Sequence, residues 1–317
     1  MNILFLNAGR RVELVRLFRA AGHELGVNPR VIGTDVQPFA PALRECEACF
    51  RLPDTRSAEF PVNLLGLCQR ESIDLIVPTI DPDLRVLAQM RDELASCGVL
   101  ALVGPSASID ICRDKVNLAT FLGKRGFPAV PILSADEACC PAFVKPRDGS
   151  ASIHAFPART PEELSFFSRY VPNAIIQPLL TGAEYTVDVF CDRDLRAIAT
   201  IPRRRLKVRS GEVVLARVER DEALEKLAAS VAEALQLIGP SNLQIIRGAS
   251  GPQIIEVNPR FGGGCPLSIA AGAPLARWAL QLVLGDTLDA SFTVRDGYTM
   301  MRYDQSFFTD HGDKIFA

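Results

Sequence analysis

The first 104 residues alternate short apolar runs with longer amphipathic segments. The apolar runs at residues 2–6, 30–34, 73–78 and 99–103 are strand-sized, whereas residues 12–21 and 84–97 place apolar side chains at helical spacing. Strands that alternate with helices are typical of a parallel sheet covered by helices on its faces. We therefore expect an α/β domain over residues 1–105.

A second pattern covers residues 242–258, where two strand-like runs flank a turn at 248–252. Side chains alternate faces along a strand, so Glu256 and Asn258 share a face. A five-residue turn pairs Arg247 with Gln253 and brings Gln244 opposite Glu256, whereas a four-residue turn puts those two side chains on opposite faces. In the first register three oxygen-bearing side chains converge, which suits Mg²⁺ that carries nucleotide phosphates. An ordinary hairpin with a polar outer face explains the spacing equally well.

The middle of the chain contains a lysine within an apolar strand. Residues 142–146 read Ala-Phe-Val-Lys-Pro, and small residues follow at 149–152. A buried ammonium is costly unless it meets an anion, and small residues let backbone N–H groups approach phosphates. The Gly-Lys-Ser/Thr of a Walker A loop is absent. Further helices are expected at 106–110, 116–125, 223–237, 267–271 and 275–284, strands at 175–178, 184–189 and 297–303, and a loose end at 311–317.

Composition narrows the function classes. The chain has 317 residues, is 48% hydrophobic and 23% charged, and carries a net charge of −2. This balance gives no support for bulk binding of nucleic acid or of anionic membranes, although residues 202–209 form a local basic cluster. No signal-peptide pattern or membrane-length apolar run is present, so we expect a cytoplasmic protein. Nine scattered cysteines indicate reduced thiols, and three histidines do not favour a zinc site or a catalytic triad.

An NAD-dependent oxidoreductase is one alternative for the first domain. Asp35 follows the second strand, where an acid that binds ribose would lie. The first turn, however, reads Ala8-Gly9-Arg10-Arg11 instead of G-x-G-x-x-G, and two bulky arginines oppose close approach of a pyrophosphate.

The pattern Glu256-x-Asn258-x-Arg260 at a strand end, with Gln244 a dozen residues earlier, resembles the metal-binding signature of the ATP-grasp superfamily. The similarity is closest to the branch of the carbamoyl-phosphate synthase large subunit and biotin carboxylase. The resemblance implies a Rossmann-like pre-ATP-grasp domain at 1–105 and one two-subdomain ATP-grasp unit of the α+β type at 106–290. It further implies a small mobile subdomain at about 117–185, and a final strand and tail at 291–317.

The same resemblance implies roles for individual residues. Lys115 and Lys145 would neutralise ATP phosphates, and Ser150 would lie in the loop that covers them. The backbone around Gln177 and Leu179 would bind adenine, and Glu184 would bind ribose. Gln244, Glu256 and Asn258 would hold Mg²⁺ or Mn²⁺, while Arg260 and Lys145 would act in catalysis. Candidate substrate contacts are Arg10 and Arg11, Thr79 and Asp81, and the pair Arg205 and Arg209.

These roles imply an ATP-dependent carboxylate ligase. Such an enzyme converts ATP to ADP and phosphate, forms an acylphosphate and passes the acyl group to an amine or another nucleophile, most typically forming a C–N bond. The expected partners are small molecules, and the resemblance leaves open whether the chain is a homodimer or needs a further subunit. A regulatory subunit that binds nucleotide without turnover remains an alternative. The identity of the carboxylate and of the acceptor lies outside what the sequence predicts.

Overall fold

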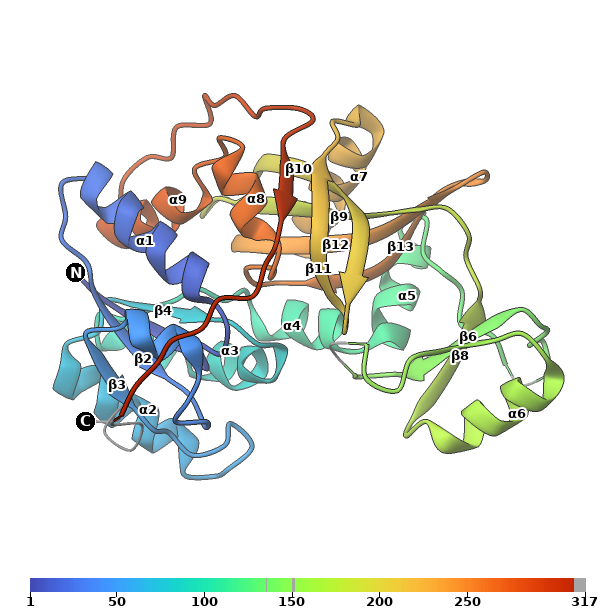
Figure 1. Ribbon diagram of the computed structural model, residues 1–317, viewed down its shortest axis with the longest axis horizontal. Coiled ribbons are helices and arrows are strands. Elements are labelled where there is room, and N and C mark those ends of the chain that lie inside the picture. Colours follow the sequence, from blue (N-terminus) through green and yellow to red (C-terminus); the bar gives the residue numbers. More distant parts are fainter. Residues whose placement is uncertain (135, 150–151, 311–317) are drawn as a thin grey trace.

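The computed structural model describes residues 1–134, 136–149 and 152–310. Figure 1 shows three parts: a helix-covered sheet formed by the first third of the chain, a large sheet with helices packed on it, and a small sheet that projects to one side. The last described segment returns from the large sheet across the first part. The mixed architecture confirms the predicted fold class, a parallel α/β domain followed by antiparallel sheets.

The first part is a five-stranded parallel sheet in the order β3-β2-β1-β4-β5. This is the strand order of a Rossmann fold, in which ligands bind beyond the carboxyl ends of the strands. Its elements are β1 (Asn2–Leu6), α1 (Val12–Glu24), β2 (Arg30–Thr34), a 3-10 helix (Pro41–Glu45), β3 (Ala48–Phe50), α2 (Phe60–Glu71), β4 (Leu75–Pro78), α3 (Asp81–Ser96) and β5 (Leu100–Ala101).

The large sheet has six strands in the order β13-β12-β9-β10-β11-β14, and each strand is antiparallel to its neighbours. Its strands are β9 (Ala183–Cys191), β10 (Ala197–Arg209), β11 (Glu212–Val218), β12 (Gly239–Gly248), β13 (Gly251–Asn258) and β14 (Thr299–Met301), and its helices are α7 (Glu222–Ala234), α8 (Cys265–Ala270) and α9 (Leu275–Leu284). One hydrophobic cluster joins this sheet to the first part, because Phe18 of α1 packs between Phe5 and Phe261 with ring centroids 5.2 and 5.5 Å away.

The small sheet has the order β7-β6-β8. Its elements are β6 (Ala142–Pro146), β7 (Phe156–Ala158), α6 (Pro161–Tyr170) and β8 (Ala174–Pro178), and α4 (Ser106–Arg113) and α5 (Lys115–Lys124) connect the first part to it. Its buried core consists of Val144, Ala158 and Val171. The small size of this core means that few contacts hold the small sheet in shape, and its predicted mobility stays a prediction.

The β12–β13 hairpin reaches the register with Gln244 opposite Glu256, but not by the five-residue turn. The turn is only Ala249-Ser250, and Arg247 pairs with Pro252. A β-bulge then inserts Ile255 into β13, so the register shifts by one residue before Glu256. Consecutive residues at a bulge can face the same side, and Ile255 and Glu256 both line the same cavity.

Most predicted elements agree with the structure to within a few residues, and β1 and β2 agree at both ends. Seven elements of the described residues lie where no element was expected: the 3-10 helix, β3, α2, β7, α6, β10 and β11. The basic cluster at 202–209 is the second half of β10. Within the described residues, no helix is long and apolar enough to cross a membrane.

Candidate active site

Two adjoining cavities lie between the small sheet and the amino-terminal domain. Cavity 1, of about 330 Å³, lies between the small and large sheets, and cavity 2, of about 200 Å³, lies between the large sheet and the first domain. Ser152, Arg205, Gln244 and Glu256 line both cavities. Two of the predicted metal ligands, Gln244 and Glu256, therefore lie at the junction of the two cavities, and the third, Asn258, lines cavity 2. Cavity 1 has the size of a small-molecule site.

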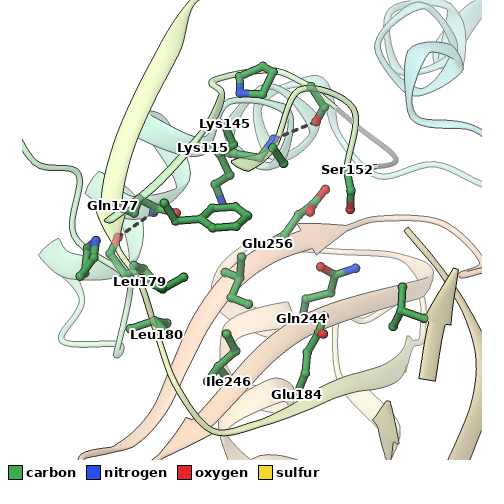
Figure 2. A pocket seen from close by; sticks show the side chains of 18 of the residues that line it. Lys115, Lys145, Ser152, Gln177, Leu179, Leu180, Glu184, Gln244, Ile246 and Glu256 are labelled. Atoms are coloured by element: carbon green, nitrogen blue, oxygen red, sulfur yellow. Dashed lines mark hydrogen bonds between the residues drawn. The ribbon is translucent and has the colours of Figure 1, made fainter. Parts of the chain in front are cut away.

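The two walls of cavity 1 come from different sheets. Figure 2 shows Lys115 and Lys145 on the side of the small sheet, and Gln244, Glu256 and Glu184 on the side of the large sheet. Apolar side chains fill much of the remaining wall, among them Phe143, Leu180, Ile246 and Ile255. A cavity with an apolar end and a cationic end suits a nucleotide, because the base is planar and largely apolar and the phosphates are anionic.

The two lysines have different surroundings. Lys145 is 6% exposed, and burial lowers its pKa to about 8, with Glu256 opposing and Lys115 reinforcing the shift. Lys115 lies at the first turn of α5 and is 8% exposed, and its Nζ donates to the Gly149 carbonyl at 2.8 Å. That hydrogen bond ties the helix to the loop after β6. An anionic ligand between the lysines would offset the free-energy cost of burying both charges.

The pKa of Lys145 predicts how nucleotide affinity depends on pH. At pH 7 Lys145 is mostly protonated and can pair with phosphate, but above about pH 8 the free protein loses that proton. We expect the affinity for Mg·ATP to fall above pH 8, by at most about tenfold per pH unit. Titration calorimetry between pH 7 and 9.5 measures this fall. Lys145→Arg keeps its charge over that range, so an equally steep fall in the variant would assign the effect to another group.

The predicted base and ribose contacts line cavity 1. The side chain of Gln177 is buried and donates through Nε2 to the Val130 carbonyl at 3.3 Å, while the backbone N–H of Leu179 donates to the Pro141 carbonyl at 3.3 Å. Glu184 lies on β9, and its Oε1 is 3.2 Å from Arg205 Nε. Because the backbone N–H of Leu179, at the predicted adenine edge, has a long hydrogen bond within the protein, a base could replace its acceptor at small cost.

The side-chain amide of Asn258 lies close to two carboxylates, those of Glu256 and Asp81. The Asn258 amide has one atom 3.1 Å from Glu256 Oε1 and 3.2 Å from Asp81 Oδ1; it hydrogen-bonds to both if that atom is the nitrogen. If that atom is the oxygen, it faces two other acceptor oxygens, Glu256 Oε1 and Asp81 Oδ1, and a cation among the three oxygens is needed to make the arrangement favourable. Two ligands at right angles around Mg²⁺, each at about 2.1 Å, lie about 3 Å apart. Glu256 and Asn258 therefore fit a shared divalent ion, with Gln244 paired opposite Glu256.

Arg260 is held in place by Asp81, which comes from the start of α3 in the first domain. Its Nε and Nη2 donate to the two Asp81 oxygens at 2.8 and 2.6 Å, and its Nη1 donates to the Phe261 carbonyl. Burial would raise the pKa of Asp81, but the charge and hydrogen bonds of Arg260 outweigh it and lower the pKa. Asp81, expected as a substrate contact, is thus the partner that orients Arg260 at the wall of cavity 2.

Arg203 lines cavity 2 and was not singled out from the sequence. It is 1% exposed, and its Nε and Nη2 donate to Asp188 at 2.7 and 2.8 Å. Its Nη1 finds no acceptor within the described part of the chain, and neither does Arg205 Nε, which is poorly aligned with Glu184. A buried donor without an acceptor costs about 1–3 kcal/mol, so these atoms favour an anion in cavity 2. Strand alternation places Arg203 and Arg205 on one face, and that signal was available in the sequence.

The three glycines at 262–264 leave space for the guanidinium groups of Arg11 and Arg203. A Cβ on Gly264 would collide with Arg203 Nη1 and lie 2.9 Å from Val213 Cγ1. We expect Gly264→Ala to lower the free energy of unfolding by about 1–3 kcal/mol, as overpacking does, and to weaken anion binding in cavity 2. Urea unfolding measures the first effect. Gly66→Ala is the matched control: Gly66 lies in α2 with open space around it, and alanine there should stabilise by about 0.5–1 kcal/mol.

The remaining predicted residues lie in different places. Thr79 lines cavity 2, but its hydroxyl donates to the Asn7 carbonyl at 2.5 Å. Arg10 lines a third cavity and is 3.8 Å from Asp304, while Arg209 is exposed and makes a bidentate pair with the same Asp304. Neither Arg10 nor Arg209 lines cavity 1 or 2, as far as the described residues go. Ser150 lies outside the described residues, and Ser152 lines cavities 1 and 2.

The acid that an NAD site would require is engaged within the protein. Asp35 is 7% exposed, and its two oxygens accept from the backbone N–H groups of Gly9 and Gln37, both at 2.8 Å. A ribose would have to displace both hydrogen bonds. The turn after β1 is therefore closed by Asp35, which opposes the oxidoreductase alternative.

Two family models match the chain. Residues 170–305 match the family described as ATP-grasp in the biosynthetic pathway with Ter operon. Residues 3–102 match the PylC-like amino-terminal domain. The first match covers β9 to β14, which carry Glu184, Gln244, Glu256 and Asn258.

Solved structures of similar fold include three enzymes. Biotin carboxylase from Campylobacter jejuni, in a complex with βγ-ATP, has a TM-score of 0.74 at 15% identity over 92% of this chain and 73% of its own. N5-carboxyaminoimidazole synthetase from Staphylococcus aureus with ADP has a TM-score of 0.74 at 15% identity over 92% and 79%. An L-amino acid ligase from Bacillus licheniformis has a TM-score of 0.69 at 18% identity over 89% and 74%.

The fold and the two family models agree with the order of motifs along the chain. The chain carries an ATP-grasp domain, matched over residues 170–305, and a PylC-like amino-terminal domain in front of it, matched over residues 3–102.

Proposed function

We propose that the chain is an ATP-dependent ligase that phosphorylates a carboxylate and transfers the resulting acyl group to an amine. The observation that carries this proposal is the junction of cavities 1 and 2, where Glu256 and Gln244 line both chambers and Lys145 faces them from the small sheet. A phosphoryl group that crosses from one chamber to the other must pass these side chains.

The nucleotide would occupy cavity 1. The apolar side chains near Leu180 and Ile246 would contact the base, and Glu184 would accept hydrogen bonds from the ribose hydroxyls. Lys115 and Lys145 would neutralise the phosphates, and Mg²⁺ held by Glu256, Asn258 and Gln244 would supply charge neutralisation at the transferred group. Positioning and electrostatic stabilisation account for most of the catalysis of phosphoryl transfer, so no protein nucleophile is required.

The carboxylate would occupy cavity 2. Arg203 Nη1 has no acceptor within the described residues, Arg205 lines the same cavity with Glu184 3.2 Å from its Nε, and Arg260 is held at the same wall by Asp81. A carboxylate oxygen would attack the γ-phosphorus, and ADP would leave. Arg260 would then stabilise the negative charge of the transferred group. The enclosed position between two sheets would limit hydrolysis of the acylphosphate by water.

Trapping with hydroxylamine tests this proposal. The protein is incubated with Mg·ATP, hydroxylamine and a panel of amino acids, dicarboxylates and hydroxy acids, and hydroxamate and ADP are measured together. We expect at least one carboxylate to give hydroxamate and ADP in equal amounts. Binding of Mg·ATP without hydroxamate or ADP for every carboxylate would instead assign the chain to the nucleotide-binding proteins without turnover.

A further inference from the structure

A third cavity, of about 320 Å³, adjoins cavity 2 on the side away from the nucleotide. It lies between the start of α1, the start of β11 and the segment after β14, which crosses the first domain in Figure 1. Arg11, Glu212, Gly262 and Gly263 line both cavity 2 and cavity 3. Because two of these four residues have no side chain, the partition between the cavities is thin.

The charged part of the partition centres on Glu212. Arg11 Nη1 donates to Glu212 Oε1 at 3.0 Å, and Arg302 Nη1 donates to Glu212 Oε2 at 3.4 Å. Burial would raise the pKa of Glu212, but the two arginines outweigh it and lower the pKa, so the carboxylate is ionised. A ligand at this wall meets both an anion and two guanidinium groups.

The rest of the cavity 3 lining combines apolar with charged side chains. The apolar ones include Val12, Pro266, Met300, Met301 and Phe307, and the charged ones are Arg10, Glu13, Arg16 and Asp304. Arg10 lies 3.8 Å from Asp304, and Arg16 makes an ion pair with Glu45 at 2.7 Å. Met301 is 76% exposed although it is a large apolar side chain at the edge of the sheet. A ligand that contacts both these apolar side chains and the Glu212 partition therefore combines an apolar body with a positive and a negative group at one end.

We propose that cavity 3 binds the amine substrate, an α-amino acid or short peptide with an apolar side chain. Its carboxylate would pair with Arg302 or Arg11, its ammonium would pair with Glu212, and its side chain would lie against Met301 and Phe307. The amine would then lie beside Gly262 and Gly263, where cavity 3 adjoins cavity 2 and the acyl group would be within reach. This inference rests on the proposed function, and it adds the class of the second substrate and its direction of entry.

The proposed acyl transfer from the acylphosphate to the amine needs no further reactant. The ammonium loses one proton to water, and its nitrogen lone pair attacks the acyl carbon beside Gly262 and Gly263, where cavities 2 and 3 adjoin. The new C–N bond forms as the C–O bond to phosphate breaks. The nitrogen loses its second proton to the departing phosphate.

Comparing a small nucleophile with a large one tests the inference. Hydroxylamine needs no cavity of its own, whereas L-methionine, L-leucine and L-phenylalanine would need cavity 3. Met301→Trp fills the outer part of the cavity, and Arg302→Met removes a cation that lines cavity 3 but not cavity 2. Phe308→Trp is the matched control, because Phe308 lies on the same segment, is 93% exposed and does not line the cavity.

We expect Met301→Trp and Arg302→Met to raise KM for the amino acid at least tenfold and to leave hydroxamate formation within twofold of wild type. Phe308→Trp should change neither. An unchanged KM for the amino acid in both variants, an equal loss of both reactions, or hydroxamate without any amide from the three amino acids would overturn this inference alone. Absence of hydroxamate in the wild type would contradict the proposed function as well.

Discussion

Replacing Glu256 by glutamine is expected to lower ligase turnover about 10²–10³-fold. Glutamine keeps the shape and one amide oxygen, but it removes the negative charge from the metal-ligand set, whose other members are Gln244 and the Asn258 amide. Binding of ATP without Mg²⁺ should persist, because the lysines that face the phosphates are unchanged. Steady-state kinetics with saturating Mg²⁺ measure the loss.

Glu256→Gln is also expected to change the pH dependence of ATP affinity. Glu256 raises the pKa of Lys145, so its neutralisation should lower that pKa further below about 8. The pH at which ATP affinity begins to fall should therefore move downward in Glu256→Gln. Glu222→Gln is the control, since Glu222 is an exposed partner of Lys226 on α7. Wild-type turnover in Glu256→Gln would contradict the metal assignment.

Replacing Lys145 by methionine is expected to abolish the stabilisation of the protein by Mg·ATP and to make the free protein more stable. The depression of the pKa of Lys145 from 10.5 to about 8 corresponds to about 3 kcal/mol of unfavourable free energy for the charged form. Methionine has a similar length and no charge, so part of this free energy should be regained. We expect a melting temperature about 3–6 °C higher than that of the wild type.

The difference in stability between Lys145→Met and the wild type depends on pH, because the pKa of Lys145 is lower in the folded chain than in the unfolded chain. Between pH 8 and 10.5 the unfolded chain binds more protons at this lysine than the folded chain, so wild-type stability at this site rises with pH. The advantage of Lys145→Met should be complete below pH 8 and shrink as the pH rises towards 10.5. Calorimetric unfolding at pH 7 and 9.5 measures it, with the exposed Lys124→Met as control. Equal stabilisation by Mg·ATP in Lys145→Met and wild type would show that Lys145 does not contact the nucleotide.

The alternation of strand-sized and helix-sized segments was enough to predict the parallel α/β domain of the first third, whereas the arrangement of the later sheets was implied by the resemblance. The strand β1 has a nearly continuous apolar run, and the motif around Glu256 has a fixed spacing. The register of the β12–β13 hairpin was predicted with the correct partner for Glu256 but through the wrong turn. A bulge at Ile255 compensates for a shorter turn, and a bulge depends on strand twist and neighbouring packing that spacing does not encode.

Contacts between segments far apart in the sequence account for what the sequence did not predict. The pairing of Asp81 with Arg260 joins residues 179 positions apart, and Arg203 is aimed by Asp188 across β9 and β10. Arg10 and Arg209 are both arginines near the expected pocket, yet both pair with Asp304 on the segment after β14. Residue type alone did not distinguish these arginines from Arg203, which lines cavity 2.

The central claim is that the γ-phosphoryl group passes to a carboxylate at the junction of cavities 1 and 2. Its most direct test uses the carboxylate identified by hydroxamate trapping, labelled with ¹⁸O in both oxygens, with mass spectrometry of the phosphate released during ligation. The account predicts ADP as the nucleotide product and one ¹⁸O atom in each phosphate. Unlabelled phosphate, or ¹⁸O recovered in AMP, would contradict it.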